Sequence, residues 1–235
     1  MPDRLQFESL RRSVPAVLPS LLMCDFGNLQ REVARLEEAG VAGLHLDVMD
    51  GHFVPNLTYG MPLVAALRKL TRLPLDVHLM ISEPSRYIRA FQEAGADAIT
   101  FHVEAVNDPR PLLTEIRELG IAGGLAINPD TPLARLESSI ELCNLALVMS
   151  VPAGFGGQEF RANAVERLQH VRQLAGPQLL LEVDGGIAAE TIGRCAQAGA
   201  QLFVVGSALF RQPAYGTYVA ELRQRAEVHV TSIQG

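Results

Sequence analysis

Short apolar runs alternate along the chain with polar, Ala-rich segments of helical character. Short apolar runs bounded by polar or Gly residues are typical of buried strands. The segments predicted as helical include Gly27–Ala39, Pro84–Ala94 and Thr191–Ala198. The pattern predicts eight strands: Ala16–Leu22, Gly43–Met49, Leu75–Met80, Ala98–Val103, Ala122–Ile127, Leu145–Val151, Leu179–Val183 and Leu202–Val205.

A four-residue phrase recurs where the helical segments end. It reads Glu38-Ala39-Gly40-Val41, Glu93-Ala94-Gly95-Ala96, Glu118-Leu119-Gly120-Ile121 and Gln197-Ala198-Gly199-Ala200. A Gly directly after a helix is the left-handed residue that ends it, so the phrase marks the junction from helix to strand. The spacing from Gly40 to Gly199 fits a unit of roughly 26 residues, near the length of one strand and its helix.

Alternating strands and helices indicate a parallel sheet. Eight such units in 235 residues favour a closed (β/α)8 TIM barrel over an open doubly wound sheet. No linker or shift in composition divides the chain, so we expect one domain over residues 1–235, with about 1–12 and 228–235 loosely held. Hydrophobic residues make up 48% of the chain and charged residues 20%, an ordinary globular balance.

The overall charge and the cysteines exclude several classes of protein. The net charge is -6 and no basic run stands out, so we expect no nucleic-acid partner. The three cysteines are far apart, which indicates neither a disulfide framework nor a cysteine zinc site. Without a secretory leader or an apolar run of membrane-spanning length, we expect a cytoplasmic protein with no membrane partner. An anionic substrate remains open, because backbone N–H groups or a metal can make a site locally positive.

Ionisable residues lie on three of the predicted core strands. Side chains alternate between faces, so His45, Asp47 and Met49 share one face of strand two, and Asp76, His78 and Met80 share one face of strand three. On strand seven Glu182 and Asp184 share a face. A single buried His more often bonds a backbone carbonyl, and a single strand-end Asp more often caps a helix. Four such groups on one rim of a barrel instead favour a common site, because buried charges are costly unless paired or metal-bound.

Two imidazoles and two carboxylates suit a borderline divalent cation. We therefore expect one divalent metal ion per chain, with zinc, iron(II), manganese and cobalt all open. The candidate ligands are His45, Asp47, His78 and Asp184.

Gly-rich loops follow strands six, seven and eight. They contain Gly154-Phe155-Gly156-Gly157, Gly185-Gly186 and Gly206-Ser207. Glycines let backbone N–H groups approach an anion closely, and phosphate sites on these barrels are often built from the loops after strands seven and eight. One Gly pair would only indicate a tight turn, but three on consecutive loops favour a phosphate site.

These motifs together resemble the ribulose-phosphate 3-epimerase family. The resemblance runs from about Pro19 to Phe210 and is strongest in the run from His45 to Asn56, HLDVMDGHFVPN. It also includes Pro19-Ser20-Leu21-Leu22, Asp76-Val77-His78-Leu79-Met80, Gly154-Phe155-Gly156-Gly157-Gln158 and Glu182-Val183-Asp184-Gly185-Gly186-Ile187.

The resemblance implies a role for each matching residue. It makes His45, Asp47, His78 and Asp184 metal ligands, with Asp47 and Asp184 also the two acid/base residues. Substrate contacts would come from Ser20, His78, Met49, Met80, Met149, Gly154, Phe155, Gly156, Gly157, Gly185, Gly186, Gly206 and Ser207. Without the resemblance, the three methionines would be assigned to core packing.

The implied reaction inverts C3 of D-ribulose 5-phosphate to D-xylulose 5-phosphate through a 2,3-enediolate. The partner would be a small sugar phosphate, and family members commonly associate as dimers or hexamers. Two segments depart from the family pattern: Met23-Cys24 replaces the usual Ser-Ala after strand one, and Pro152-Ala153 replaces Asn-Pro after strand six.

Three alternatives stay open, and the two departures bear on the first of them. A D-allulose 6-phosphate 3-epimerase would share the metal set and mechanism, and it carries a Met-Cys pair offset by one position. A sugar-phosphate lyase or decarboxylase usually has a Lys beside the strand acids, whereas strand three has His78 and the nearest candidate, Lys69, lies in the helix before it. The intact set of two His and two Asp argues against a catalytically silent phosphosugar binder.

Overall fold

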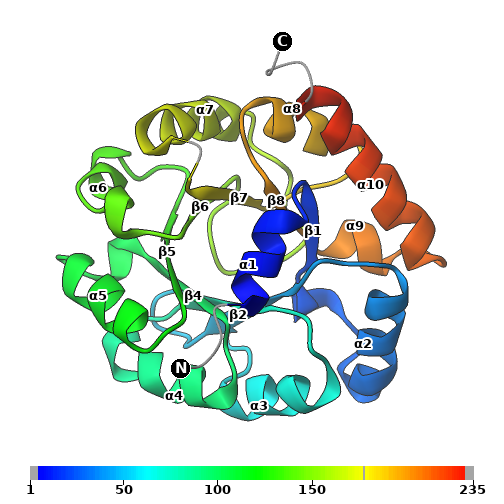
Figure 1. The fold of residues 1–235 in the computed structure, drawn as a ribbon, viewed down its shortest axis with the longest axis horizontal. Helices are drawn as coiled ribbons and strands as arrows, with labels where there is room; N and C mark the ends of the chain where they lie inside the picture. The colour runs from blue at the N-terminus through cyan, green and yellow to red at the C-terminus, as the bar shows by residue number, and fades with distance from the viewer. Residues whose placement is uncertain (1–4, 177, 231–235) are drawn as a thin grey trace.

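Eight parallel strands form one sheet that curves into a nearly closed barrel (Figure 1). The computed structural model describes residues 5–176 and 178–230. The strands are β1 (Ala16–Pro19), β2 (Leu44–Met49), β3 (Leu75–Met80), β4 (Ala98–His102), β5 (Ala122–Ile127), β6 (Leu145–Met149), β7 (Leu180–Asp184) and β8 (Leu202–Val205). Their order is β1-β8-β7-β6-β5-β4-β3-β2, and a parallel bridge between Ser20 and His45 links β1 to β2. The predicted TIM barrel is confirmed.

Helices surround the barrel and fill the connections between its strands (Figure 1). They are α1 (Leu5–Arg12), α2 (Leu29–Glu38), α3 (Met61–Leu70), α4 (Ile88–Ala94), α5 (Arg110–Glu118), α6 (Ala134–Glu137), α7 (Asn163–Ala175), α8 (Ile192–Gln197), α9 (Ser207–Phe210) and α10 (Tyr215–Val230). Within residues 5–176 and 178–230, no helix is long and apolar enough to cross a membrane.

The recurring Gly positions end helices as predicted. Gly40, Gly95, Gly120 and Gly199 have φ angles of 73°, 109°, 79° and 101°. At Gly95 a Cβ atom would stand 2.6 Å from Arg68 Cγ, so the packing against α3 also requires a residue without a side chain. The phrase therefore marks the helix-to-strand junctions that set the barrel repeat.

Two strands end two or more residues before the apolar runs that predicted them. β1 ends at Pro19, where Ser20 still donates its backbone N–H to Val205 O at 3.1 Å, and Leu21–Met23 then form a 3-10 turn. β6 ends at Met149 rather than at Val151. After Pro19 and after Met149 the chain leaves the barrel and forms a loop over its carboxyl end. Apolar residues continue into these loops, so the sequence pattern does not distinguish them from strand residues.

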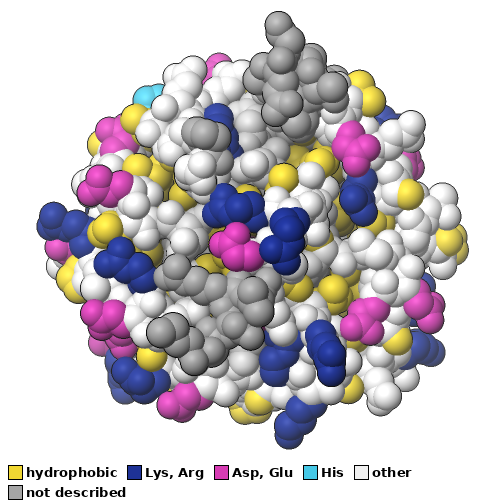
Figure 2. Space-filling model, in the orientation of Figure 1, with side chains coloured by type: hydrophobic (Ala, Val, Ile, Leu, Met, Phe, Trp, Pro, Cys, Tyr) yellow, Lys and Arg dark blue, Asp and Glu magenta, His cyan; other side chains and the backbone are white. Residues whose placement is uncertain are grey.

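The N-terminal helix α1 covers the amino end of the barrel. The expectation that residues 1–12 are loosely held is wrong for residues 5–12, because Phe7 and Leu10 are 2% and 1% exposed and pack against the lowest inward-facing side chains, such as Leu145 and Leu202. Their spacing of three places both on one face of a helix. Figure 1 shows α1 across the barrel axis, and Figure 2 shows basic and acidic side chains scattered over this face. Residues 1–4 and 231–235 lie outside the described residues, and 228–230 belong to α10.

The main hydrophobic core lies between the strands and the helices. Outward-facing residues of the strands, such as Leu44, Leu46 and Leu79, belong to it and are fully buried. The inward-facing residues are apolar near α1 and become polar farther along the barrel axis, where Asp76, His45 and Glu182 lie below Asp47, His78 and Asp184. Apolar packing around the outside of the strands and at their amino ends therefore stabilises the barrel. The carboxyl end is the place where barrels of this kind have their active sites.

Candidate active site

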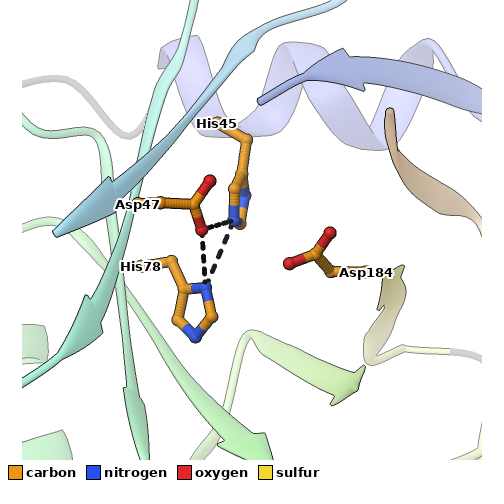
Figure 3. Close-up of side chains that lie close together, drawn as sticks. All are labelled: His45, Asp47, His78 and Asp184. Carbon is orange, nitrogen blue, oxygen red and sulfur yellow. Dashed lines mark hydrogen bonds and ion pairs between the residues drawn. The ribbon is translucent and has the colours of Figure 1, made fainter. Parts of the chain in front are cut away.

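Four inward-facing side chains of β2, β3 and β7 converge near the carboxyl end of the barrel (Figure 3). Asp47 Oδ1 lies 3.2 Å from His78 Nδ1 and 3.5 Å from His45 Nε2, and the two ring nitrogens are 3.4 Å apart. Asp184 faces this group from the opposite strand, and one donor atom of each residue lies within 4.8 Å of those of the others.

The His45 ring nitrogen that points away from this group contacts a carboxylate. His45 Nδ1 lies 2.6 Å from Asp76 Oδ2, and Glu182 Oε1 is 3.5 Å from the same nitrogen. Burial favours the neutral ring, yet the charges of Asp47 and Asp76 raise the pKa of His45 above its ordinary value. Burial and the nearby Asp76 raise the pKa of Glu182 to about 8. Three carboxyl groups, those of Asp47, Asp76 and Glu182, therefore crowd around the His45 ring, and their mutual repulsion disfavours ionisation of Glu182.

The His78 ring nitrogen that points away from this group contacts another histidine. His78 Nε2 lies 2.9 Å from His102 Nε2, and His102 Nδ1 lies 3.0 Å from Glu104 Oε2. Burial lowers the pKa of His78 to about 4, which keeps the ring neutral at physiological pH. Burial would raise the pKa of Glu104, but hydrogen bonds from His102, Thr131 and Asn128 lower it to about 2.

The two Asp residues of the group have different surroundings. The Ser20 hydroxyl and Asp47 Oδ2 are 2.5 Å apart, and the backbone N–H of Asp47 donates to the Tyr59 hydroxyl at 3.1 Å. Burial acts against the Asp47 carboxylate, but contacts with His45 and His78 lower its pKa well below the usual range. For Asp184, burial and the nearby charge of Asp47 raise the pKa to about 7.

The donor set fits a divalent cation. Three donor atoms already face one another at 3.2–3.5 Å, with the Asp184 carboxylate beside them. The non-facing nitrogen of each imidazole is engaged by another side chain, as is usual for metal-bound histidines. The carboxyl groups that crowd around His45 repel one another when they are ionised, and a cation beside them would offset that repulsion. Of the sequence-predicted ligands, His45, Asp47 and His78 are buried and Asp184 is partly buried.

A cavity opens directly above these side chains. Every other residue predicted to contact substrate lines it: Ser20, Met49, Met80, Met149, Gly154, Phe155, Gly156, Gly157, Gly185, Gly186, Gly206 and Ser207. Asp47 and Asp184 also line it, whereas His45 and His78 are 0% exposed beneath its floor. The sequence motifs on six different strands and their loops therefore surround one space.

The glycine loops are shaped by their backbones. Gly157, Gly185 and Gly186 have φ angles of 74°, 108° and 59°, which other residues rarely adopt. At Gly186 a Cβ atom would stand 2.6 Å from the backbone nitrogen of Phe160, so two loops meet there without room for a side chain. The Ser150 hydroxyl donates to the carbonyls of Asp184 and Gly185 and so fixes the turn after β7.

The two segments that depart from the family pattern lie at the cavity, where Met23 and Pro152 line it. Two other residues close to the site were missed in the sequence. His102 ends β4, and its place on the face that Ala98 and Thr100 share could have pointed to it. Glu104 lies in the turn beyond β4, and nothing in the strand pattern indicates its direction.

Comparison with known proteins connects this arrangement to a family. The profile described as the ribulose-phosphate 3 epimerase family matches residues 16–210. The chain belongs to this family. The Ribulose-phosphate 3-epimerase of Bacillus subtilis is 43% identical over 211 residues, covering 88% of this chain and 97% of the relative. That of Synechocystis is 44% identical over 212 residues, covering 88% and 92%. The cytoplasmic isoform of Oryza sativa is 41% identical over 215 residues, covering 90% and 94%.

Solved structures of other proteins share the barrel of this epimerase-family chain. A 3-keto-L-gulonate-6-phosphate decarboxylase from Vibrio cholerae has a TM-score of 0.69 at 20% identity and covers 92% of this chain and 99% of its own. A mutant tryptophan synthase alpha-subunit from Pyrococcus furiosus has a TM-score of 0.66 at 17% identity, covering 93% and 98%. At these identities the likeness supports the fold alone.

Proposed function

We propose that this chain is an epimerase that inverts C3 of D-ribulose 5-phosphate to D-xylulose 5-phosphate through a 2,3-enediolate. The observation that carries the proposal is the pairing of Asp47 and Asp184, whose carboxylates come from β2 and β7 and approach within 4.8 Å at the floor of one cavity. Membership of the ribulose-phosphate 3-epimerase family supports the same reaction.

Epimerisation requires a proton to leave one face of C3 and another to return to the opposite face. Asp47 and Asp184 serve as base and acid, and they exchange roles when the reaction runs backward. Their origin on different strands lets them approach the sugar from different sides. Ser20 holds one oxygen of Asp47, so the carboxylate keeps one orientation.

We assign His45, Asp47, His78 and Asp184 as the ligands of one divalent metal ion. A bound cation supplies Lewis-acid stabilisation of the charge that develops on the substrate. Zinc, iron(II), manganese and cobalt all suit two imidazoles and two carboxylates. Met49, Met80 and Met149 line the cavity around the reacting carbons and exclude water there.

The phosphate is held in this proposal by backbone N–H groups of Gly156, Gly157, Gly186, Gly206 and Ser207. These residues belong to the loops after β6, β7 and β8, and the short helix α9 begins at Ser207. Barrels of this kind often bind phosphate with the loops after strands seven and eight and a short extra helix. Binding of the phosphate positions C3 between the two carboxylates.

A D-allulose 6-phosphate 3-epimerase is the second candidate. The position of Met23 is the observation that favours this alternative. A Cβ atom built on Gly156 would lie 2.9 Å from the Met23 sulfur, and one built on Gly206 would lie 3.4 Å from Met23 Cγ. Met23 therefore borders the space between the phosphate loops and the sugar. A longer substrate would change the contacts made by this side chain first.

The test is to incubate the purified protein with ribulose 5-phosphate and, separately, with allulose 6-phosphate, and to follow product formation by NMR. We expect faster turnover of ribulose 5-phosphate and loss of activity after exhaustive chelation, restored by added metal. A preference for allulose 6-phosphate would establish the second candidate. Full activity without metal would contradict the metal assignment, and no turnover of either sugar would overturn the proposed function.

The proposal extends to the assembly and location of the protein. We expect a homo-oligomer, either a dimer or a hexamer, and a cytoplasmic location. A relative from rice is named as a cytoplasmic isoform.

A further inference from the structure

Which ring nitrogen of the neutral His78 side chain carries the proton depends on the groups that the two nitrogens face. His78 Nδ1 faces Asp47 Oδ1 at 3.2 Å, and His78 Nε2 faces His102 Nε2 at 2.9 Å. Two ring nitrogens at that distance share one hydrogen bond, in which one donates its N–H and the other accepts with its lone pair. The pair alone does not determine which ring donates.

Glu104 determines which of the two rings donates in the hydrogen bond between His78 and His102. His102 Nδ1 lies 3.0 Å from Glu104 Oε2, and an ionised carboxylate only accepts. The other oxygen of Glu104 accepts from the backbone N–H of Asn128 at 2.8 Å and from the Thr131 hydroxyl at 2.5 Å. A bare lone pair on His102 Nδ1 would face this carboxylate at 3.0 Å, which is repulsive. His102 therefore carries its proton on Nδ1.

The proton of His78 follows from this. With its proton on Nδ1, His102 accepts at Nε2, so His78 donates from Nε2 and keeps a lone pair on Nδ1. Asn128 Nδ2 also approaches His102 Nδ1, but at the longer distance of 3.3 Å. The Asn128 amide is oriented by Ala153, whose backbone N–H donates to Asn128 Oδ1 at 2.9 Å.

The surroundings hold the His102 ring in place. The His78 and His102 rings stack with centroids 5.0 Å apart, and the Phe53 ring lies 4.9 Å from His102 on the loop after β2. Arg167 of α7 donates to the carbonyls of Asn128 and Thr131 at 3.0 Å and 2.9 Å, which fixes the loop that contacts Glu104. The chain from Glu104 to His78 is therefore ordered on both sides.

We propose that Glu104, acting through His102, is a positioning residue that keeps the proton of His78 on Nε2 and leaves Nδ1 free to bind the divalent cation. The inference rests on the proposed function, in which His78 is a metal ligand. His45 achieves the same result directly, because its Nδ1 lies 2.6 Å from Asp76 Oδ2. Partners of this kind typically change metal affinity 10–100-fold when they are removed.

The decisive variant is Glu104→Gln, with Thr131→Val as its matched control. In Glu104→Gln the amide oxygen accepts from Asn128 and Thr131, so the amide nitrogen faces His102 and donates to it. That reverses both hydrogen bonds and places a proton on His78 Nδ1. Thr131→Val removes a hydrogen bond from the same carboxylate but leaves the contact with His102 in place.

The measurements are zinc affinity by competition with a chromogenic chelator and the visible absorption spectrum of the cobalt-substituted protein. We expect zinc to bind Glu104→Gln about 10–100-fold more weakly than wild type, with an altered cobalt spectrum, and Thr131→Val to match wild type. Equal affinity for Glu104→Gln and wild type would overturn the inference alone. Equal weakening in both variants would also overturn it, because it would indicate loop stability rather than proton placement. A wild type that binds no metal would overturn the metal assignment and this inference together.

A second measurement needs no variant and so does not depend on the folding of Glu104→Gln. Nitrogen-15 NMR of histidine side chains in the zinc-loaded wild type distinguishes the two neutral ring forms. We expect His102 to carry its proton on Nδ1. A proton on Nε2 of His102 would refute the direction of the chain.

Discussion

The Ser20 hydroxyl lies 2.5 Å from Asp47 Oδ2 and donates a hydrogen bond to it. The other oxygen, Oδ1, is the atom that faces His45 and His78. The two oxygens of one carboxylate therefore have separate partners. Ser20 was expected to contact substrate, and it does line the cavity, but its hydroxyl proton is used by Asp47.

Replacing Ser20 with Ala should slow the reaction without unfolding the barrel. The change leaves Asp47 Oδ2 without its donor, and an unpaired buried acceptor costs about 1–3 kcal/mol. Because every 1.4 kcal/mol is tenfold, kcat/KM for ribulose 5-phosphate should fall roughly 5–100-fold. The control is Ser82→Ala, which removes a hydroxyl donor from Asp50, a carboxylate outside the cavity lining. Similar kcat/KM values for both variants and wild type would contradict the role of Ser20.

Substituting Asp47 or Asp184 by Asn should separate the two halves of the reaction. General acid–base catalysis contributes about 10²–10⁴-fold, so net epimerisation should fall at least that far in either variant. Each variant keeps one carboxylate and should still exchange the C3 proton of one epimer in deuterated water. One variant should be selective for ribulose 5-phosphate and the other for xylulose 5-phosphate.

Metal content must be measured on both Asn variants first, because each change also alters a candidate ligand. If both metal-loaded variants exchanged the same epimer, the assignment of two opposed acid/base residues would be wrong. Inversion at the wild-type rate in either variant would have the same consequence.

A methyl group at Gly156 should weaken recognition of the phosphate. A Cβ atom there would stand 2.9 Å from the Met23 sulfur, at the cavity wall, so it would force Met23 aside and crowd the neighbouring N–H groups. The methyl group and the displaced Met23 would then occupy space beside the phosphate loops. The ratio of kcat/KM for ribulose 5-phosphate to that for free ribulose should therefore fall in Gly156→Ala, about tenfold for each 1.4 kcal/mol of phosphate binding that is lost.

Gly216→Ala on α10 is the matched control, because a Cβ there would meet only Ala39 Cα at 3.7 Å. Its ratio should equal that of wild type. An unchanged ratio in Gly156→Ala would show that the phosphate binds elsewhere.

Truncating a buried side chain of the N-terminal helix α1 should destabilise the whole barrel. Phe7 is 2% exposed and covers the apolar layer at the amino end, so Phe7→Ala should lower the free energy of unfolding by about 3–5 kcal/mol in urea denaturation. Leu174→Ala, at a position 45% exposed, should change it by less than about 0.5 kcal/mol. A small effect at Phe7 would mean that α1 is dispensable for folding.

The regular part of the fold was predictable because it repeats. The Gly residues that end helices, such as Gly40 and Gly199, act through local backbone geometry, which sequence expresses directly. The face shared by His45 and Asp47 followed from strand alternation. The end of β1 at Pro19 did not, because the apolar residues after it line a loop instead of a strand.

The contacts around the candidate site were harder to predict because they join residues distant in the chain. Sequence placed Ser20 near the site but did not reveal that its hydroxyl bonds Asp47. The contact between His78 and His102 depends on the relative register and tilt of β3 and β4, which alternation within each strand does not specify. For the same reason α1 was taken for a loose end, although it covers an apolar layer that is assembled from residues of six strands.

The cavity lining among the described residues contains no Lys or Arg, while the whole chain has a net charge of -6. Backbone dipoles act only at contact, and the proposed divalent cation would offset only part of the net charge of -6, so a doubly charged sugar phosphate approaches against the long-range field of the protein. Ions at 0.15 M screen such fields beyond about 8 Å. Substrate capture should therefore become faster as ionic strength rises, opposite to enzymes that draw anions in through a basic funnel.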